Sequence, residues 1–480
     1  MSGAAKAIAS QGLKLRALSL GAVKAFDHAM QFLLPVLLVR CLDTASFGEY
    51  RLLWLAVGTV MAVAILNMPG SLYYFMPRAS APEKRLYVHQ TLAYLGIAGL
   101  VCAFAVSPWN PWLPEAVKPL MKYGAVVPAF IALWVTSTLL EYVPTVDERI
   151  SWQAYATVVV AVMRVVLLGA AAWFTGDLAI MLWLLVGTVV VKLALLFAYI
   201  QRYHGLGPPW LKRGTFAGQV RYAVPFGIAS AFYGLRAQAD QWVAASLFAL
   251  QSFAAFSIAA ILGQVVNIFR NSVLEAFLPS MSRMEAAGDV KSVLDMNARA
   301  NVMVGTLLYP LLGFFFAFAE DIVSFVYTAA YVEAAPVMRV YIVGLVLMVV
   351  EVGSIILLLR QGTFSLVVTL VALALSVAVS WAAASHIGLA GAAAGSVLAL
   401  YVDRFLTLRR IASQTGVPIA RLQRWSHLVW LLLVTALSAL IARLAVENWA
   451  DALPVLARVA IGGTILSALY CGAVLVRNRR

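Results

Sequence analysis

Apolar runs of about twenty residues recur along the whole chain, and shorter polar segments separate them. A helix of that length crosses the roughly 30 Å hydrocarbon layer of a bilayer. The runs lack the period-2 alternation of barrel strands, and lipid leaves helices as the other way to satisfy the backbone. The pattern therefore predicts an all-α polytopic membrane protein.

The runs define the expected spans and the loops between them. We count about fourteen by the length criterion, at residues 17–39, 52–75, 86–107, 121–143, 153–174, 179–200, 219–246, 252–278, 297–318, 336–359, 363–384, 388–408, 427–445 and 455–476. The outward loops near 108–120 and 319–335 are the longest of their side. They are too short for a folded catalytic domain, so we expect a transporter and not an enzyme.

Lys and Arg residues gather in alternate loops. One set of segments includes the cluster Arg404, Arg409, Arg410, Arg421 and Arg424, whereas the opposite set is poor in cations. Cytoplasmic loops of membrane proteins carry this excess. The asymmetry predicts a bacterial inner-membrane protein with both termini in the cytoplasm, and residues 1–16 are expected to form a basic amphipathic lead-in on that face.

Composition changes the interpretation of the net charge. Apolar residues make up 63% of the chain and charged residues 12%, with a mean hydropathy of +0.90 and a net charge of +14. In a soluble protein such a charge would indicate a nucleic-acid partner. Here the inward loops account for it, so we expect the lipid bilayer as a partner and no nucleic acid. Cys41, Cys102 and Cys471 lie far apart without metal-ligand spacing, and no cofactor is expected.

A faint internal repeat divides the chain. LDTASFGEY followed by FMPR near the start matches FALQSFAAF followed by FLPSMSR, which pairs Phe47 with Phe253, Tyr50 with Phe256 and Pro77 with Pro279. Duplicated halves are a recurrent transporter plan. We therefore expect two pseudo-symmetric six-helix lobes, 17–205 and 206–412, followed by two further helices in 413–480. Gly391 and Gly395 form a GxxxG motif that favours close helix packing.

Charged and polar residues interrupt the apolar spans. Such groups are costly in lipid, which makes them functional candidates. One helical face of the first span carries Lys24, Asp27, His28 and Gln31, and the seventh span carries Tyr233, Arg236 and Asp240 in a similar rhythm. The remaining candidates are Gln264, Asn267, Arg270, Asn271 and Glu275 in the eighth span, Arg164 in the fifth, Lys192 in the sixth and Glu351 in the tenth.

Two interpretations of these groups stay open. Lys24 with Asp27, or Arg236 with Asp240, would each neutralise locally as structural ion pairs, and Lys192 would extend to a cytoplasmic span end. Taken together, the polar stripes instead predict a hydrated cavity between two halves. Its basic members would bind phosphate, namely Lys24, Arg164, Arg236 and Arg270, with Gln31, Tyr233, Gln264, Asn267 and Asn271 beside them. Its acidic members would take up H⁺ or Na⁺, namely Asp27, Asp240 and Glu351.

The chain resembles the Wzx-type polysaccharide transporters of the multidrug/oligosaccharidyl-lipid/polysaccharide exporter superfamily. The resemblance covers residues 15–410 and rests on RCLDTASFGEYRLLW, VRYAVPFGIASAFYGLRAQAD, EDIVSFVYTAAYVEAAPVMRVYIVGLVL and HIGLAGAAAGSVLALY. It implies a MATE-like fold of two lobes around a cavity. It also implies alternating-access transport of an undecaprenyl-diphosphate-linked glycan for exopolysaccharide or O-antigen export, alongside other polysaccharide-assembly proteins. The cationic role in the cavity carries over to Lys24, Arg236 and Arg270.

Two other functions compete with a flippase. A cation-coupled multidrug antiporter of the same superfamily predicts a cavity dominated by carboxylates and aromatic residues. Asp27 fits that expectation, but four embedded cations do not. A membrane polymerase or glycosyltransferase predicts a large outward loop with catalytic residues, and no loop of that size is present.

Overall fold

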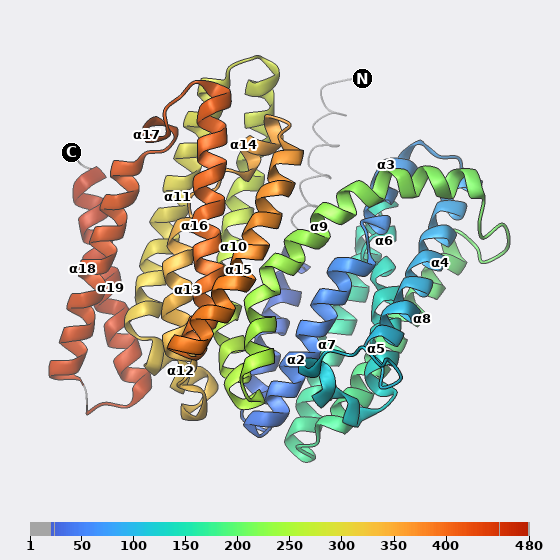
Figure 1. Ribbon diagram of the computed structural model, residues 1–480, viewed down its shortest axis with the longest axis horizontal. Helices are drawn as coiled ribbons and strands as arrows, with labels where there is room; N and C mark the ends of the chain where they lie inside the picture. Colours follow the sequence, from blue (N-terminus) through green and yellow to red (C-terminus); the bar gives the residue numbers. More distant parts are fainter. Residues whose placement is uncertain (1–20, 24, 451, 479–480) are drawn as a thin grey trace. The chain divides into compact units, whose positions relative to one another are not determined.

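The computed structural model describes residues 21–23, 25–450 and 452–478 (Figure 1). All regular elements in this part of the chain are helices, and eleven of them are long and apolar enough to cross a membrane. Ala334–Met348 is a shorter apolar helix. The expected all-helical, multi-pass class is confirmed, whereas fourteen spans stays a prediction. The chain forms two compact units, unit 1 (Met1–Gly234) and unit 2 (Leu235–Arg480), and the boundary lies inside one helix. The predicted lead-in 1–16 and Lys24 lie outside the described residues.

Unit 1 begins with helical residues 25–38. The elements that follow are α2 (Thr44–Ala64), α3 (Met68–Phe75), η1 (Met76–Arg78), α4 (Ala81–Ala105), η2 (Glu115–Tyr123), α5 (Val126–Ser137), η3 (Thr138–Glu141), α6 (Val143–Val146), α7 (Ile150–Phe174), α8 (Leu178–Tyr203) and the first part of α9 (Arg213–Leu247).

The predicted continuous span 52–75 is wrong. Helix α2 begins earlier because Asp43 caps it, accepting hydrogen bonds from the backbone of Ala45 and Ser46. It ends before Leu66 and Asn67, whose φ angles of 41° and 56° are left-handed. Helix α3 then starts with a proline in its first turn, where the missing N–H costs no hydrogen bond.

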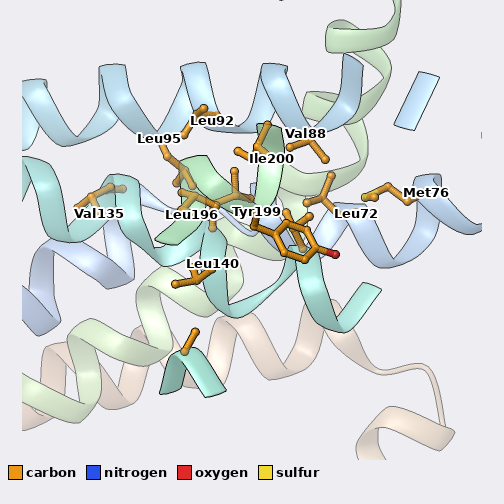
Figure 2. Close-up of a cluster of buried hydrophobic side chains, with 14 residues drawn as sticks. Leu72, Met76, Val88, Leu92, Leu95, Val135, Leu140, Leu196, Tyr199 and Ile200 are labelled. Carbon is orange, nitrogen blue, oxygen red and sulfur yellow. The ribbon is translucent and has the colours of Figure 1, made fainter. Parts of the chain in front are cut away.

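The core of unit 1 is an apolar cluster from several helices. Figure 2 shows side chains of α3, α4, α5 and α8 that converge, including Leu72, Leu92, Val135 and Leu196, each at most 5% exposed. Tyr199 lies among them, and its hydroxyl donates to Asp147 at 2.7 Å. The cluster fixes the packing of these helices within unit 1.

The start of α9 is bound to unit 1 by a buried amide. The Nε2 of Gln219 donates to the hydroxyls of Ser71 and Thr91, each at 2.8 Å. A Cβ on Gly227 would overlap the backbone of Leu66, so the helix approaches the α2–α3 break closely. The first part of α9 therefore packs as part of unit 1.

Within the described residues, unit 2 comprises the rest of α9 and eleven further helical segments. These are α10 (Leu250–Ala286), α11 (Val290–Ala317), α12 (Ala319–Tyr327), η4 (Ala329–Tyr331), α13 (Ala334–Met348), α14 (Gly353–Leu358), α15 (Gly362–Ile387), α16 (Leu389–Thr415), α17 (Ile419–Leu422), α18 (Trp425–Trp449) and α19 (Val455–Asn478).

Helices α15 and α16 lie side by side (Figure 1). A Cβ on Gly391 would overlap the backbone of Ala383, and one on Gly395 would overlap the backbone of Ser376 and Ser380. The predicted role of this GxxxG motif in close packing is confirmed.

The predicted span 336–359 is interrupted between α13 and α14. Glu351 lies in the break, and its carboxylate accepts hydrogen bonds from the backbone of Gly353 at 2.6 Å and Ser354 at 3.2 Å. A buried amide supports the same turn, because Asn301 accepts from the Glu351 N–H and donates to its carbonyl and to Gln423. A carboxylate that caps a short helix replaces the expected continuous span.

The terminal helices α18 and α19 are joined to α12 by a carboxylate. Asp321 is 6% exposed and lies 2.8 Å from Arg443 and 2.9 Å from Arg458. Phe318, at the junction of α11 and α12, packs so closely that a Cβ on Gly462 would overlap its ring. Charge and packing together fix this corner of unit 2.

The repeated sequence occupies equivalent helix positions. Phe47 is the fourth residue of α2 and Phe253 the fourth of α10, while Tyr50 and Phe256 are each the seventh. All four side chains are at most 3% exposed. The motif therefore starts a helix with the same buried face in both units. The lobe boundaries predicted at 17, 206 and 413 stay predictions.

Candidate anion site

Unit 1 places three of the predicted residues together. Arg164 on α7 is 7% exposed, and its NH2 lies 3.7 Å from an oxygen of Asp27 in helix 25–38. Gln31, one turn further along, donates to the other oxygen of Asp27 at 2.8 Å. The guanidinium also lies over the ring of Trp54, 5.9 Å from its centroid. Asp27 thus neutralises Arg164 within unit 1.

A second cation of unit 1 is also paired. Lys192 on α8 is 6% exposed and contacts Glu141 at 2.6 Å, with its ammonium over the ring of Trp134. Its expected extension toward a span end is wrong. The carboxylate of Glu141 neutralises the ammonium of Lys192 where it lies, so the side chain does not extend to water.

Unit 2 brings together a group of three arginines, hereafter the arginine group: Arg236 on α9, Arg270 on α10 and Arg404 on α16. The NH1 of Arg236 lies 3.4 Å from Asp403, the residue that precedes Arg404. Arg404 is close enough to Arg236, Arg270, Asp403 and Glu351 to interact with each of them electrostatically. The group therefore collects positive charge from three helices.

Arg404 is buried without full compensation. It is 7% exposed, and its Nε has no hydrogen-bond partner within the described residues, as is true of the Nε of Arg270. Among the described side chains, the ion pair of the arginine group joins Arg236 to Asp403, and no carboxylate lies within ion-pair distance of Arg270 or Arg404; the side chain of Glu275 is not described. With Glu351 also acting on Arg404, three cations face two carboxylates among the described side chains.

Asp240 lies in a network of its own. It is 3% exposed, and the hydroxyl of Tyr341 on α13 donates to it at 2.7 Å. Its other oxygen accepts from the backbone of Gln241. Arg236 pairs with Asp403 and not with Asp240, so the local Arg236–Asp240 pair is wrong.

The other predicted lining residues differ in exposure. Tyr233 is 55% exposed, and Gln264 and Asn271 are also exposed, whereas Asn267 is half-buried with an unpartnered Oδ1. Arg270 donates to Asn271 at 3.4 Å. Asn271 therefore lies beside the arginine group through its contact with Arg270. Glu351 caps α14, and Arg164 pairs with Asp27 in unit 1.

Asp403, Arg404 and Glu141 are site residues that the sequence pattern did not single out. Arg404 was assigned to a cytoplasmic segment because four more arginines follow it. A helical signal was present: Arg404, Thr407, Leu408 and Ile411 share one face of α16, and all are buried. An apolar face that continues past a charge indicates that the charge is inside the fold.

Comparison with known proteins identifies the fold and the family. Residues 16–285, more than half of the chain, match the family described as "Polysaccharide biosynthesis protein". The lipid II flippase MurJ in an inward closed conformation aligns with a TM-score of 0.69 at 12% identity, covering 96% of this chain and 99% of that one. An inward-facing MATE multidrug resistance transporter of the MOP superfamily aligns at 0.63 and 14% identity, covering 81% and 96%. No curated protein matches the sequence.

Proposed function

Because the chain belongs to the polysaccharide biosynthesis protein family and has the fold of MurJ and the MATE transporters, we propose that it is a flippase for a lipid-linked oligosaccharide. The substrate is an undecaprenyl-diphosphate-linked repeat unit that moves from the cytoplasmic to the periplasmic leaflet by alternating access. The product serves exopolysaccharide or O-antigen export. The protein acts in the inner membrane with both termini in the cytoplasm, as two six-helix lobes and fourteen spans in all.

One observation carries the proposal: the arginine group of unit 2. Within the described residues, Asp403 lies at ion-pair distance from Arg236, and Asp403 and Glu351 act on Arg404 electrostatically, so three guanidinium groups face two carboxylates. Uncompensated buried charge is expensive, and arginine presents a planar fork of donors that matches phosphate oxygens. A diphosphate would supply the missing negative charge.

The direction of transport agrees with the membrane potential. Moving a net-negative headgroup out of a cell that is negative inside is favourable by about 2.3 kcal/mol per charge per 100 mV. Ion coupling through Asp27, Asp240 or Glu351 is therefore an addition that transport does not require. Each of these carboxylates already accepts a hydrogen bond within the protein.

The multidrug antiporter is the second candidate, since its fold is the same. Drug cations require a carboxylate that is free to bind them, and Asp27 is occupied by Arg164 and Gln31. This occupation favours the flippase. Deletion of the gene separates the two: a flippase leaves undecaprenyl-linked glycan in the cytoplasmic leaflet, whereas an antiporter changes drug susceptibility.

Substitution of the arginine group tests the proposed substrate. We expect Arg236→Ala and Arg270→Ala to abolish complementation of the deletion strain, because each removes a phosphate donor, while both proteins still insert at normal levels. The measurement is surface polysaccharide together with protein in the membrane fraction. Full complementation by both variants would refute the proposed role of these side chains.

A further inference from the structure

Two of the arginine–carboxylate clusters of unit 2 differ in geometry. In the first, Asp321 contacts Arg443 at 2.8 Å and Arg458 at 2.9 Å, and Arg443 also contacts Glu447 at 2.7 Å. These are short, charge-assisted contacts that join three helices. In the second, Arg236 contacts Asp403 at 3.4 Å, beyond the usual length of such a bond. The first cluster is a structural tie, and the second is loose.

The loose cluster also has the poorer charge balance. Asp321 and Glu447 stand against Arg443 and Arg458, two carboxylates against two cations. Around Asp403, the described side chains place two carboxylates against three guanidinium groups, because Glu351, which also caps α14, acts on Arg404 electrostatically together with Asp403. Arg404 is 7% exposed, and its Nε has no hydrogen-bond partner within the described residues. The unpartnered Nε donor of Arg404 and the excess positive charge both indicate a binding site for an anion.

We propose that Asp403 is a built-in counter-ion that occupies Arg236 when no substrate is bound and yields it to an incoming phosphate, with Arg404 as a further phosphate-binding residue. The inference rests on the proposed function and names residues of that same site. It gives Asp403 a role opposite to that of a binding group: its carboxylate competes with the ligand.

Such competition has a use in transport. A site that conducts must bind its cargo strongly enough to load and weakly enough to release it. Three arginines without a competitor would hold a diphosphate tightly. When the diphosphate leaves, Asp403 returns to Arg236, so the cations are never left without any counter-ion. The carboxylate thereby weakens binding and speeds release.

Anion binding to the purified full-length protein tests the inference. The probes are inorganic pyrophosphate and undecaprenyl diphosphate in nanodiscs, which separate a free diphosphate from a lipid headgroup. We expect Asp403→Asn to bind both about tenfold more tightly, and Asp403→Glu to bind like the wild type because it keeps the competitor. Tighter binding of the lipid alone would assign the site to a headgroup. Binding by Asp403→Asn that is equal to or weaker than the wild type for both probes overturns the proposal.

Arg404 supplies the second test. We expect Arg404→Gln to weaken pyrophosphate binding about tenfold and Arg404→Lys to retain more of it, since Lys keeps the charge without the fork. Unchanged binding in Arg404→Gln overturns the role of that residue, and this variant decides alone where Asp403→Asn does not fold. Asp321→Asn is the matched control: it removes a carboxylate from the structural tie, and its binding of pyrophosphate should equal that of the wild type.

The proposed function can fail separately. If the deletion strain accumulates no lipid-linked glycan while Asp403→Asn still binds pyrophosphate more tightly, the flippase assignment is wrong and the counter-ion role stands. If the glycan accumulates and Asp403→Asn binds like the wild type, the flippase stands and the counter-ion role is wrong.

Discussion

Units 1 and 2 both bury cations among apolar helices, but they neutralise them differently. In unit 1, Arg164 has Asp27 and Lys192 has Glu141, one carboxylate for each cation. In unit 2, the three cations of the arginine group face two carboxylates among the described side chains, Asp403 paired with Arg236 and Glu351 acting on Arg404. Balanced pairs need no ligand, whereas an excess of buried charge does. The number of charged residues in apolar helices therefore does not locate a binding site. The site becomes apparent only when each charged residue has been matched with its ion-pair partner.

The two units differ in backbone as well. The shared motif starts both α2 and α10 at the same helix positions, yet α2 ends at Ala64 while α10 continues through Pro279 to Ala286. Asn67 and Pro69 make the break in unit 1. A common starting pattern thus leads to a broken helix in one unit and a helix of 37 residues in the other.

The largest expected effect on stability comes from removing one counter-ion in each unit, Glu141 in unit 1 and Asp403 in unit 2. Glu141→Gln removes the half-exposed carboxylate that neutralises the buried Lys192, and an uncompensated buried cation costs up to about 3 kcal/mol. We expect a lower melting temperature for Glu141→Gln and for Asp403→Asn. Pyrophosphate should restore the melting temperature of Asp403→Asn alone, because only there can an anion replace the lost carboxylate. Thermal unfolding in detergent with and without pyrophosphate measures both.

A double variant controls that experiment. Glu141→Gln with Lys192→Met removes both charges and should recover most of the lost stability, since no uncompensated cation remains. Equal rescue of Glu141→Gln and Asp403→Asn by pyrophosphate would abolish the distinction between the two units.

Much of the fold follows from the sequence because lipid imposes simple rules. Long apolar runs predicted the helical class, and Gly391 with Gly395 predicted a close contact. The breaks at Asn67 and Glu351 were missed, because both positions lie inside runs that are apolar enough to continue. There, backbone conformation and capping decide, and hydropathy does not report them.

The candidate site was harder to predict than the fold. Arg236, Arg270 and Arg164 were identified because charges stand out within apolar spans. Asp27 was also identified, though not as the partner of Arg164, whereas Asp403 was not, since it lies more than 160 residues from Arg236 in sequence. Pairing depends on which helices pack together, and helical periodicity gives only the face on which a residue lies.

A smaller effect is expected from helix packing. Gly395→Ala places a Cβ against the backbone of Ser376 and Ser380 in unit 2, and overpacking of this kind costs about 2 kcal/mol. Gly187 on α8 of unit 1 has no atom within 4 Å of an added Cβ, so Gly187→Ala should be neutral or slightly stabilising. Melting temperatures of the two variants test the contrast. A stable Gly395→Ala would mean that α15 and α16 separate at little cost.

The smallest expected effect concerns a charge network at the ends of unit 1 helices. Asp147 follows α6, and His204 and the hydroxyl of Tyr199 each lie 2.7 Å from its Oδ2. Burial opposes ionisation, but these hydrogen bonds outweigh it and hold the pKa of Asp147 below its ordinary 3.8. A lowered pKa in the folded state stabilises the protein at pH values above 3.8, and this contribution is lost as the pH falls through the lowered pKa.

Asp147→Asn should therefore reduce stability by about 1 kcal/mol at pH 7, the usual net contribution of such bonds. The gap in melting temperature between wild type and variant should narrow as the pH is lowered below 4, because protonation then removes the same charge from the wild type. A gap that is constant from pH 7 to pH 3 would show that Asp147 acts through packing and not through its charge. Unit 2 offers the contrast, because Asp403→Asn should respond to pyrophosphate, whereas Asp147→Asn should respond to pH alone.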